Sequence, residues 1–247
     1  MKLAISLICC FFFKSITAQQ FPENYEPLKK QMYENLDEDW KAEIRHLIQE
    51  QPSDPWLYWM MGVAQNLQFH TDSAIYYFEQ SIQVDPTFAS GYHILGSFYT
   101  NMDNENCKKA IDLFSKAIQF DSLNGYYFSD RGAMYFKLKQ YDLALSDCKK
   151  AITCDEYLSP GPFVIIVKSL LQQNKREELN AFIQQRVFIG SNGFWDTDFD
   201  LLMGNLYEEN GDLNMACECY THAIYMLEVM EEAIPPTLLE KRKKCPN

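Results

Sequence analysis

The sequence predicts an all-α fold in which antiparallel pairs of helices stack along the chain. Three observations carry this expectation. Four segments repeat one residue pattern, the first three at intervals of about 34 positions and the last after about two such intervals; Gly and Ala recur at fixed places inside it, and Asp-Pro or Gly-containing turns separate the segments. A unit of this length buries its apolar face only against its neighbours, so several units must stack.

Within each segment, a Gly precedes an Ala, then a larger side chain, then a second small residue. The members are Gly62, Ala74, Phe78 and Ser81; Gly96, Tyr99, Ala110, Phe114 and Ala117; Gly132, Tyr135, Ala144, Cys148 and Ala151; and Gly204, Tyr207, Ala216, Tyr220 and Ala223. Spacings of three and four place these residues on one face of each helix. The small residues mark where two helices cross most closely, since larger side chains would push the axes apart.

This pattern resembles the tetratricopeptide repeat (TPR), whose units are two antiparallel helices of about 34 residues together. The resemblance covers most of residues 55–230 and implies a right-handed α-solenoid, the TPR superhelix. It places units at 55–88, 89–124, 125–159 and 197–234. Residues 160–196 keep the apolar spacing but lose the Gly and Ala, which predicts a degenerate fourth unit.

The two ends of the array are expected to be covered by further helices, because a terminal repeat otherwise exposes an apolar edge. Residues 19–54 contain an amphipathic helix with an acidic start at 37–50, which predicts a helical cap or partial repeat. Pro235 and Pro236 interrupt the last long helix. The segment 235–247 is then expected to form a short basic capping helix or tail.

Residues 1–18 have the composition of a signal peptide. Lys2 is followed by an apolar run of 11 residues at 3–13 and by small residues before Ala18. That run is shorter than the roughly 20 residues that cross a bilayer, so cleavage after Ala18 is favoured, with a retained anchor as the alternative. The chain has no Asn-x-Ser/Thr acceptor. We therefore expect export to a bacterial periplasm or secretion, and no membrane span after cleavage.

The charge balance excludes some partners. Residues 1–18 contain two basic residues, Lys2 and Lys14, and no acidic one. The rest of the chain therefore has 20 basic and 34 acidic residues, a net charge of −14. Such an acidic chain is a poor ligand for nucleic acid or for anionic lipid. The expected partner is a protein or peptide.

Six cysteines remain after that cleavage, and their spacing shows no regular disulfide framework. Export permits disulfides, but a helical array does not need them, so mostly free or buried thiols are expected. Cys148 replaces the aromatic residue of its unit and should lie in the core. Cys219 and His222 lie on the same face of their helix, whereas Cys217 points elsewhere. This arrangement favours buried thiols and a surface histidine over a metal site.

No pattern for catalysis is present. None of the four histidines has a nucleophile at a suitable spacing, and the chain has no Gly-rich phosphate loop or paired-cysteine zinc pattern. The sequence thus predicts a protein that is not an enzyme and that needs no cofactor or metal.

The resemblance implies that the first helix of each unit lines an inner groove. The candidate binding residues there are Trp59, Asn66, His93, Ser97, Asn101, Tyr126, Ser129, Phe136, Asn205, Glu208 and Glu209. The basic clamp with which some members bind chaperone tails is missing, because Trp59, Ser90 and Tyr126 occupy its positions. The groove should be aromatic at one end and acidic at the other, which favours a peptide or helix with apolar anchors and basic residues. Alternatively, Trp56 and Trp59 pack under the N-terminal helix as part of the cap.

The leading functional prediction is a non-enzymatic scaffold of the cell envelope that binds a peptide or helix of a partner in this groove. Two alternatives remain open. One is a self-assembling structural protein whose repeat ends stack on one another. The other is an accessory subunit of an envelope enzyme or transport complex. The oligomeric state and the identity of the partner are not predicted.

Overall fold

The computed structural model describes residues 22–28, 30, 39–100, 104–154, 161–186, 197–209 and 211–245. Within them, all regular secondary structure is helical. The 3₁₀ helix η1 (Glu23–Tyr25) and α3 (Asp39–Glu50) are followed by α4 (Pro55–Leu67), α5 (Thr71–Val84), α6 (Ala89–Phe98), α7 (Asn104–Phe120), α8 (Gly125–Lys137), α9 (Tyr141–Cys154), α10 (Gly161–Gln172), α11 (Arg176–Arg186), α12 (Thr197–Glu209), α13 (Leu213–Val229) and α14 (Pro236–Lys243). The leader expected at 1–18 lies outside the described residues.

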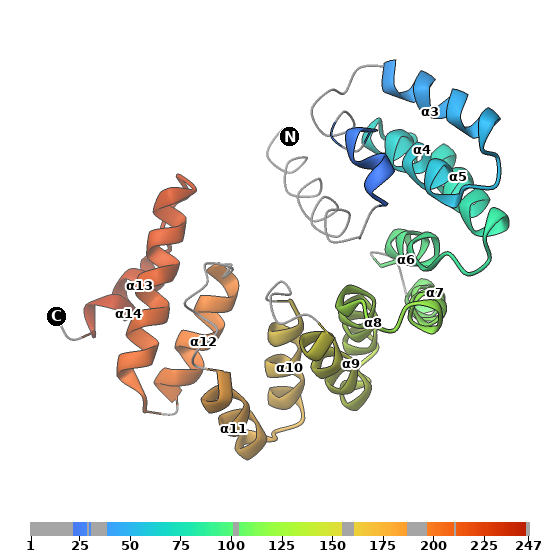
Figure 1. Cartoon of the computed structure of the whole chain (residues 1–247). Coiled ribbons are helices and arrows are strands. Elements are labelled where there is room, and N and C mark those ends of the chain that lie inside the picture. Colours follow the sequence, from blue (N-terminus) through green and yellow to red (C-terminus); the bar gives the residue numbers. More distant parts are fainter. Residues whose placement is uncertain are drawn as a thin grey trace.

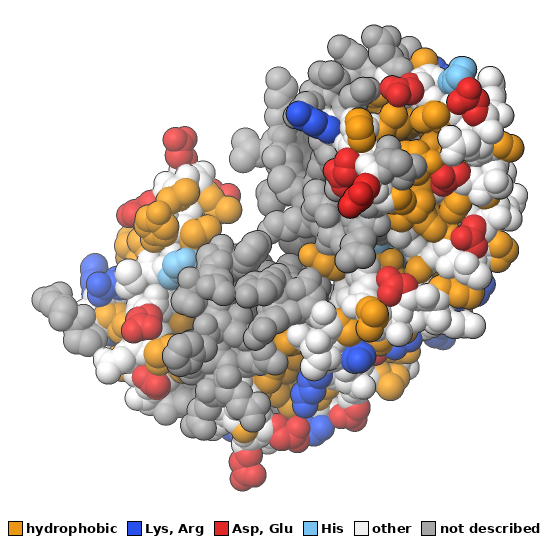
Figure 2. All heavy atoms as spheres, in the orientation of Figure 1, with side chains coloured by type: hydrophobic (Ala, Val, Ile, Leu, Met, Phe, Trp, Pro, Cys, Tyr) orange, Lys and Arg blue, Asp and Glu red, His pale blue; other side chains and the backbone are white. Residues whose placement is uncertain are grey.

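From α4 to α13 the helices form successive antiparallel pairs that follow an arc (Figure 1). The first helix of each pair (α4, α6, α8, α10 and α12) lies on the inner side of the arc, and the second lies on the outer side. Figure 2 shows the same arc as a solid body, with acidic and basic side chains spread along its outer rim. The inner helices are therefore the elements that a partner inside the arc would meet.

Helix starts follow from side chains that cap free backbone N–H groups. Asp54 accepts a hydrogen bond from the Trp56 N–H at 2.9 Å, and Pro55 stands at the first helical position. Asn124 caps α8 in the same way by accepting from the Tyr126 N–H at 3.0 Å. These caps fix where the first helix begins in two of the pairs.

A hydrogen bond from a tyrosine hydroxyl to a proline carbonyl occurs twice, 34 positions apart, and so follows the period of the sequence. The Tyr58 hydroxyl donates to the Pro52 carbonyl at 3.1 Å, and the Tyr92 hydroxyl donates to the Pro86 carbonyl at the same distance. Both bonds join a residue in the first turn of a helix to the turn that precedes it. Each bond orients the incoming chain relative to its helix pair.

The glycines lie at the helix crossings, as the sequence predicts. A Cβ added to Gly62 would stand 2.5 Å from the Phe78 ring, and one added to Gly96 would stand 2.6 Å from the Phe114 ring. At Gly204 the Tyr220 ring is 2.4 Å from such an atom, and at Gly132 the Cys148 sulfur is 2.7 Å away. Since real Cβ contacts are longer, the second helix can approach this closely only where the first has no side chain.

The pair α10 and α11 packs less extensively than the other pairs. Val167 follows Phe163 by four positions, as Gly62 follows Tyr58, so a branched side chain stands where the other units have glycine. Phe163, Val167 and Leu179 are nonetheless buried, which keeps these helices within the core. Helices therefore also form in the segment expected to be degenerate, and they pack less extensively than those of the other pairs.

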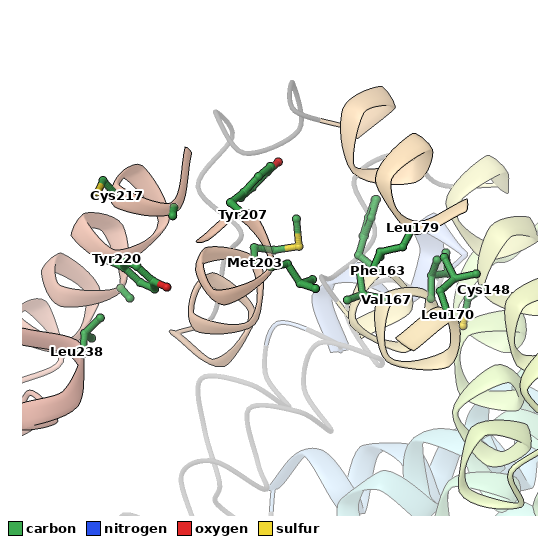
Figure 3. Close-up of a cluster of buried hydrophobic side chains, with 14 of the residues drawn as sticks. Cys148, Phe163, Val167, Leu170, Leu179, Met203, Tyr207, Cys217, Tyr220 and Leu238 are labelled. Carbon is green, nitrogen blue, oxygen red and sulfur yellow. The ribbon is translucent and has the colours of Figure 1, made fainter. Parts of the chain in front are cut away.

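Within the described residues, buried side chains form two large clusters and three small ones. One large cluster runs from Tyr25 to Leu95 over η1 and α3–α6, and the other runs from Leu145 to Cys245. Figure 3 shows part of the second cluster, with Met203 and Tyr207 of α12 lying between Tyr220 of α13 and Phe163 of α10. Smaller clusters connect α6 to α9. The apolar core is therefore thickest at the two ends of the arc.

Both ends are covered by helices. At the start, Trp40 and Ile44 of α3 are buried against the first pair, and the Tyr25 hydroxyl donates to Asp54 at 2.5 Å. At the other end, α14 lies along α13 and buries Leu238 (Figure 1). The repeat boundaries given above stay predictions.

The cysteines require one correction. Because α14 folds back onto α13, Cys245 comes within 5.5 Å of Cys217, Cα to Cα, and the two form a disulfide. Spacing along the chain could not show this pairing, since it depends on how the last helix docks. The other described cysteines (Cys107, Cys148, Cys154 and Cys219) are free, and Cys148 is fully buried as predicted.

Replacing Gly96 by Ala tests the crossing. On an open helix this change stabilises by up to about 1 kcal/mol, because Ala is the better helix former. Here the added methyl meets the Phe114 ring, so we expect a loss of about 1–3 kcal/mol in the free energy of unfolding, measured by urea denaturation. Ser146→Ala at an exposed position of α9 is the control and should change stability little. A stabilised Gly96→Ala variant would refute the close crossing.

Candidate binding site

The expected groove residues separate into buried and accessible groups. Trp59 and His93 have no exposed surface, and Ser129 is only 8% exposed, so these three side chains are not offered to a partner. Asn66, Ser97, Tyr126 and Phe136 are partly accessible on the inner helices, and Asn205, Glu208 and Glu209 are partly or fully accessible on α12. Asn101 lies outside the described residues. The accessible groups mark the candidate site on the inner side of the arc.

Trp59 packs in the N-terminal core. Its ring contacts Trp56 at 5.8 Å and Phe78 at 6.3 Å between centroids, and Trp56 in turn meets Phe88 at 4.9 Å. The same cluster contains Trp40 and Ile44 of the capping helix. This geometry agrees with the alternative in which the two tryptophans belong to the covered end of the array.

A row of polar contacts joins α6 to α8. His93 Nε2 lies 2.7 Å from Asp130 Oδ2, and the Ser90 and Tyr127 hydroxyls share a hydrogen bond at 3.5 Å. The Lys137 ammonium donates to the Thr100 carbonyl. Each contact joins residues 37 positions apart, so the same register is repeated along the interface. We refer to these three contacts as the polar row. They hold two inner helices in a fixed relation.

Burial raises the pKa of the Tyr127 hydroxyl, which belongs to the polar row. Tyr127 is 2% exposed, and burial raises the pKa of its hydroxyl to about 12. It therefore stays neutral and acts as a hydrogen-bonding group. His93 also stacks near Tyr127 and Phe114, with centroid distances of 4.8 and 5.6 Å. The row thus combines polar and aromatic contacts at one interface.

A buried ion pair fastens α8 to α9. The Arg131 guanidinium donates to both oxygens of Asp147, at 2.7 and 2.8 Å, and to the Ser115 hydroxyl of α7 at 3.0 Å. These hydrogen bonds to Asp147 raise the pKa of Arg131 above its ordinary value. The bidentate geometry is the strong form of this pair. Three helices of two neighbouring pairs are therefore joined at Arg131.

The repeat pattern does not mark Asp130, Arg131 or Asp147 as binding residues. Asp130 has a side chain 37% exposed on the inner helix α8, so it is an accessible acidic group near the middle of the arc. Its position next to Ser129 in the sequence could have suggested it. Its pairing with His93 could not have been found, because it depends on how α6 and α8 lie side by side.

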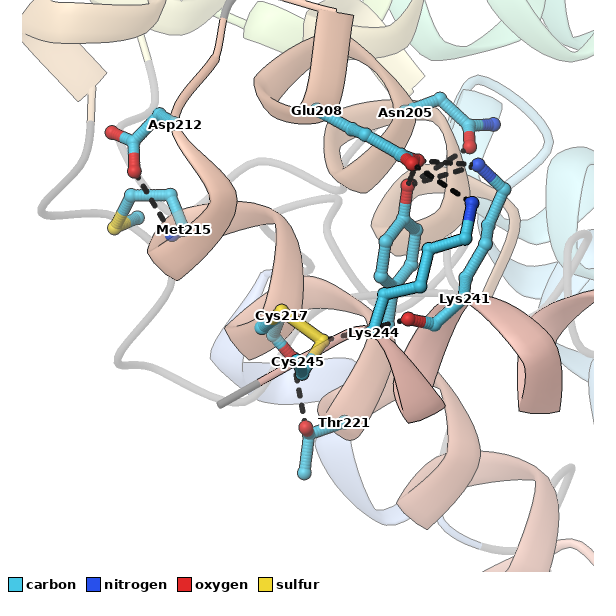
Figure 4. Close-up of a disulfide and its surroundings, with 10 residues drawn as sticks. Asn205, Glu208, Asp212, Met215, Cys217, Thr221, Lys241, Lys244 and Cys245 are labelled. Carbon is cyan, nitrogen blue, oxygen red and sulfur yellow. Dashed lines mark hydrogen bonds and ion pairs between the residues drawn. A yellow bond between two sulfur atoms is a disulfide. The ribbon is translucent and has the colours of Figure 1, made fainter. Parts of the chain in front are cut away.

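The acidic end of the expected groove is already paired within the chain. Glu208 of α12 lies 2.6 Å from the Lys241 ammonium and 3.7 Å from that of Lys244, both from the C-terminal segment. The Tyr220 hydroxyl donates to Glu208 at 2.7 Å and also lies 3.1 Å from Asn205 Oδ1 (Figure 4). Hydrogen bonds from Lys241 and Tyr220 lower the pKa of the Glu208 carboxyl. The basic groups facing this carboxylate therefore come from the protein itself.

The cysteine and histidine cluster on α13 has internal partners. Cys217 is bonded to Cys245, and His222 Nδ1 lies 2.6 Å from the Asp200 carboxylate. Burial raises the pKa of the Cys219 thiol to about 12, so this group is not a thiolate near neutral pH. Across the described part of the chain, no three His, Cys, Asp or Glu side chains converge as metal ligands would. No described helix combines the length and apolarity needed to cross a membrane.

Comparison with known proteins identifies similar sequences and folds. Residues 201–226, which cover most of α12 and most of α13, match the family model described as tetratricopeptide repeat. The fold is a TPR solenoid. A curated human relative, tetratricopeptide repeat protein 29, is 27% identical over 139 residues, which are 49% of this chain and 29% of that protein. The chain thus spans less than a third of that relative's length.

Solved TPR structures share the fold over most of the chain. PilF of Pseudomonas aeruginosa has a TM-score of 0.68 at 14% identity, covering 89% of this chain and 93% of its own. PilW, a type IV pilus biogenesis factor, has a TM-score of 0.63 at 14% identity, covering 88% and 94%. YrrB, described as a TPR protein with an unusual peptide-binding site, has a TM-score of 0.57 at 21% identity, covering 81% and 97%. These likenesses concern the fold.

The Arg131–Asp147 pair is tested by a double-mutant cycle. Arg131→Met should cost about 3 kcal/mol, because it leaves the carboxylate of Asp147, a residue 7% exposed, without its cation. Arg131→Met combined with Asp147→Leu should recover most of that loss. The control is Lys175→Met, which breaks the exposed pair with Asp142 and should change stability little. Equal losses in the single and double variants, measured by denaturant unfolding, would contradict this role.

The Glu208 pairing predicts a pH dependence of known sign. A carboxyl whose pKa is lowered by folding stabilises the folded state fully above the ordinary Glu pKa of about 4.3, and this contribution is lost as pH falls through the lowered value. We therefore expect Glu208→Gln to lower the melting temperature near neutral pH and to have little effect in acid well below that pKa. A difference between the two proteins that is independent of pH would show that the ion pair contributes nothing.

Proposed function

We propose that this protein is a non-enzymatic interaction scaffold of the cell envelope that binds a peptide or helix of a partner protein on the inner side of its arc. The observation that carries the proposal is the arrangement itself. Five inner helices line one side of a TPR solenoid, and α4, α6, α8 and α12 carry candidate binding residues that are at least partly accessible. Solenoids of this kind form extended concave surfaces suited to binding.

The accessible inner side chains define the chemistry of the surface. Asn66 and Ser97 supply an amide and a hydroxyl, Tyr126 and Phe136 supply partly exposed rings, and Asp130 supplies a carboxylate. Extended peptides need hydrogen-bonding groups for their backbone and apolar surface for one or two anchors. This mixture supports a peptide ligand better than a small substrate, which would need an enclosed and largely apolar pocket.

Export is supported by two features. The sequence begins with a segment of signal-peptide composition, and the chain contains one disulfide between Cys217 and Cys245. Disulfides persist mainly in oxidising compartments, such as the periplasm or the exterior. The fold relatives PilF and PilW include a pilus biogenesis factor by its description, which suits an envelope scaffold as a proposal for this chain.

The same type of substitution, made once on an inner helix and once on an outer helix, tests binding at the inner surface. Ser97→Arg introduces a long charged side chain on α6, and Ser146→Arg introduces the same side chain at an exposed position of outer helix α9. We expect proteins captured from the native cells by the wild type to be retained by Ser146→Arg and lost by Ser97→Arg. The measurement is quantitative affinity capture, with circular dichroism to confirm folding. Capture unaffected by Ser97→Arg would refute binding on the inner side.

A further inference from the structure

The C-terminal helix is held by few non-covalent contacts. Of the residues in α14, only Leu238 is buried, whereas the neighbouring Leu239 is 41% exposed. Polar contacts come from Lys241 and from Lys244 just after the helix, which both pair with Glu208, and Lys241 also donates to the Tyr220 hydroxyl. Partly exposed ion pairs add little stability. Burial of one leucine offsets only a small part of the conformational entropy that is lost when eight residues become ordered. Docking of α14 therefore depends on the covalent bond that follows it.

That bond lies directly after the helix. Cys245 is bonded to Cys217 in the second turn of α13, and both are buried, at 9% and 8% exposure (Figure 4). The segment that connects α13 to α14 begins with Glu231, which has a left-handed φ of 56°, and ends at Pro235. A residue other than Gly in this region carries some backbone strain. The disulfide fastens the far end of α14 to α13.

The surface beneath α14 is built to receive an ammonium group. Lys241 Nζ lies 2.6 Å from Glu208, 3.2 Å from the Tyr220 hydroxyl and 5.2 Å from the centre of the Tyr220 ring. A carboxylate, a phenol oxygen and an aromatic face converge on one cation. Asn205 Oδ1 lies 3.1 Å from the same phenol oxygen. We refer to Asn205, Glu208 and Tyr220 as the ammonium site.

We propose that the ammonium site is a docking site for a short basic helix of a partner protein, that α14 is the chain's own occupant of it, and that the Cys217–Cys245 disulfide is the latch that keeps α14 there. The proposal deepens the scaffold function above and rests on it. Leu238, Lys241 and Lys244 are spaced by three and so lie near one face of α14. They define the ligand: a helix with one apolar anchor and lysines three and six residues later.

Release of the latch is a thiol–disulfide exchange with a dithiol reductant. A thiolate of the reductant attacks one sulfur of the pair, which forms a mixed disulfide, breaks the Cys217–Cys245 bond and frees the other cysteine as a thiolate that takes up a proton. The second thiol of the reductant then attacks the mixed disulfide, frees the remaining cysteine and closes the reductant's own disulfide. Two electrons and two protons pass to the protein. Cys219, neutral because burial raises its pKa, does not compete for the bond.

The first experiment measures the latch in the full chain. Hydrogen exchange of α14 amides is followed by mass spectrometry before and after treatment with dithiothreitol. We expect protection in α14 to fall at least tenfold on reduction, while protection in α8 is unchanged. Cys245→Ser should behave as the reduced protein does, and Cys154→Ser, at a free cysteine, should keep the response to reduction. Unchanged protection of α14 in the reduced protein and in Cys245→Ser would overturn the latch.

The second experiment measures the site with a defined probe, a fluorescent peptide of residues 234–245 carrying Cys245→Ser. The acceptor is the reduced full chain with Lys241→Glu and Lys244→Glu, whose own α14 is repelled by Glu208. We expect this chain to bind the peptide at least tenfold more tightly than the oxidised wild type does. Adding Glu208→Gln to the acceptor, or Lys241→Glu to the peptide, should abolish the gain. Equal affinity in all four combinations would overturn the docking site.

These outcomes are separate from the test of the scaffold function. The Ser97→Arg variant changes α6, near the middle of the arc, whereas the peptide experiment reports on α12 and α13. If the inner-side variant loses its partners while the peptide does not bind, the scaffold function stands and the ammonium site is refuted. If the peptide binds and the inner-side variant retains every partner, recognition occurs at the end of the arc and not along its inner side.

Discussion

The close contact between a glycine on the first helix of a pair and a ring or sulfur on the second sets the geometry of the array. With no Cβ at Gly62, Gly96, Gly132 or Gly204, the second helix lies directly against the first. The angle at which each pair crosses determines how the next pair stacks, so a change at one crossing is carried along the solenoid. In α10 and α11, where Val167 takes this place, the two helices pack less extensively. The shape of the arc thus follows from the size of one side chain in each unit.

Between neighbouring pairs the contacts change character along the chain. The two ends are held by large apolar clusters, whereas the middle is joined by the polar row and by Arg131 with Asp147. Polar contacts of this kind are directional, and they specify one register between α6 and α8 where an apolar interface would tolerate several. Positions that TPR proteins can use for recognition, such as His93, here serve the stacking of repeats. The surface left for a partner is correspondingly narrower than the repeat pattern implies.

The C-terminal end joins stability and recognition in one place. An acidic group on α12 was expected to attract a basic partner, and the basic helix α14 of the same chain occupies it. Terminal repeats need a cover with a polar outer face, and α14 supplies one. Because that cover is fastened by a disulfide more than by apolar contacts, its position is tied to the redox state of the surroundings. The same helix can therefore be both a cap and a competitor for ligands.

Much of the fold could be predicted from the sequence, because the TPR pattern is local: the glycines, the alanines and the aromatic residues report helix crossings that occur within one unit. The burial of Cys148 and the helices at both ends followed from the same periodicity. What the pattern could not determine are contacts between residues far apart in the chain. The His93–Asp130 pair, the Cys217–Cys245 bond and the meeting of Glu208 with Lys241 each depend on how separate helices lie side by side. Periodicity determines the face that a residue occupies, but only the packed solenoid decides which residue it meets there.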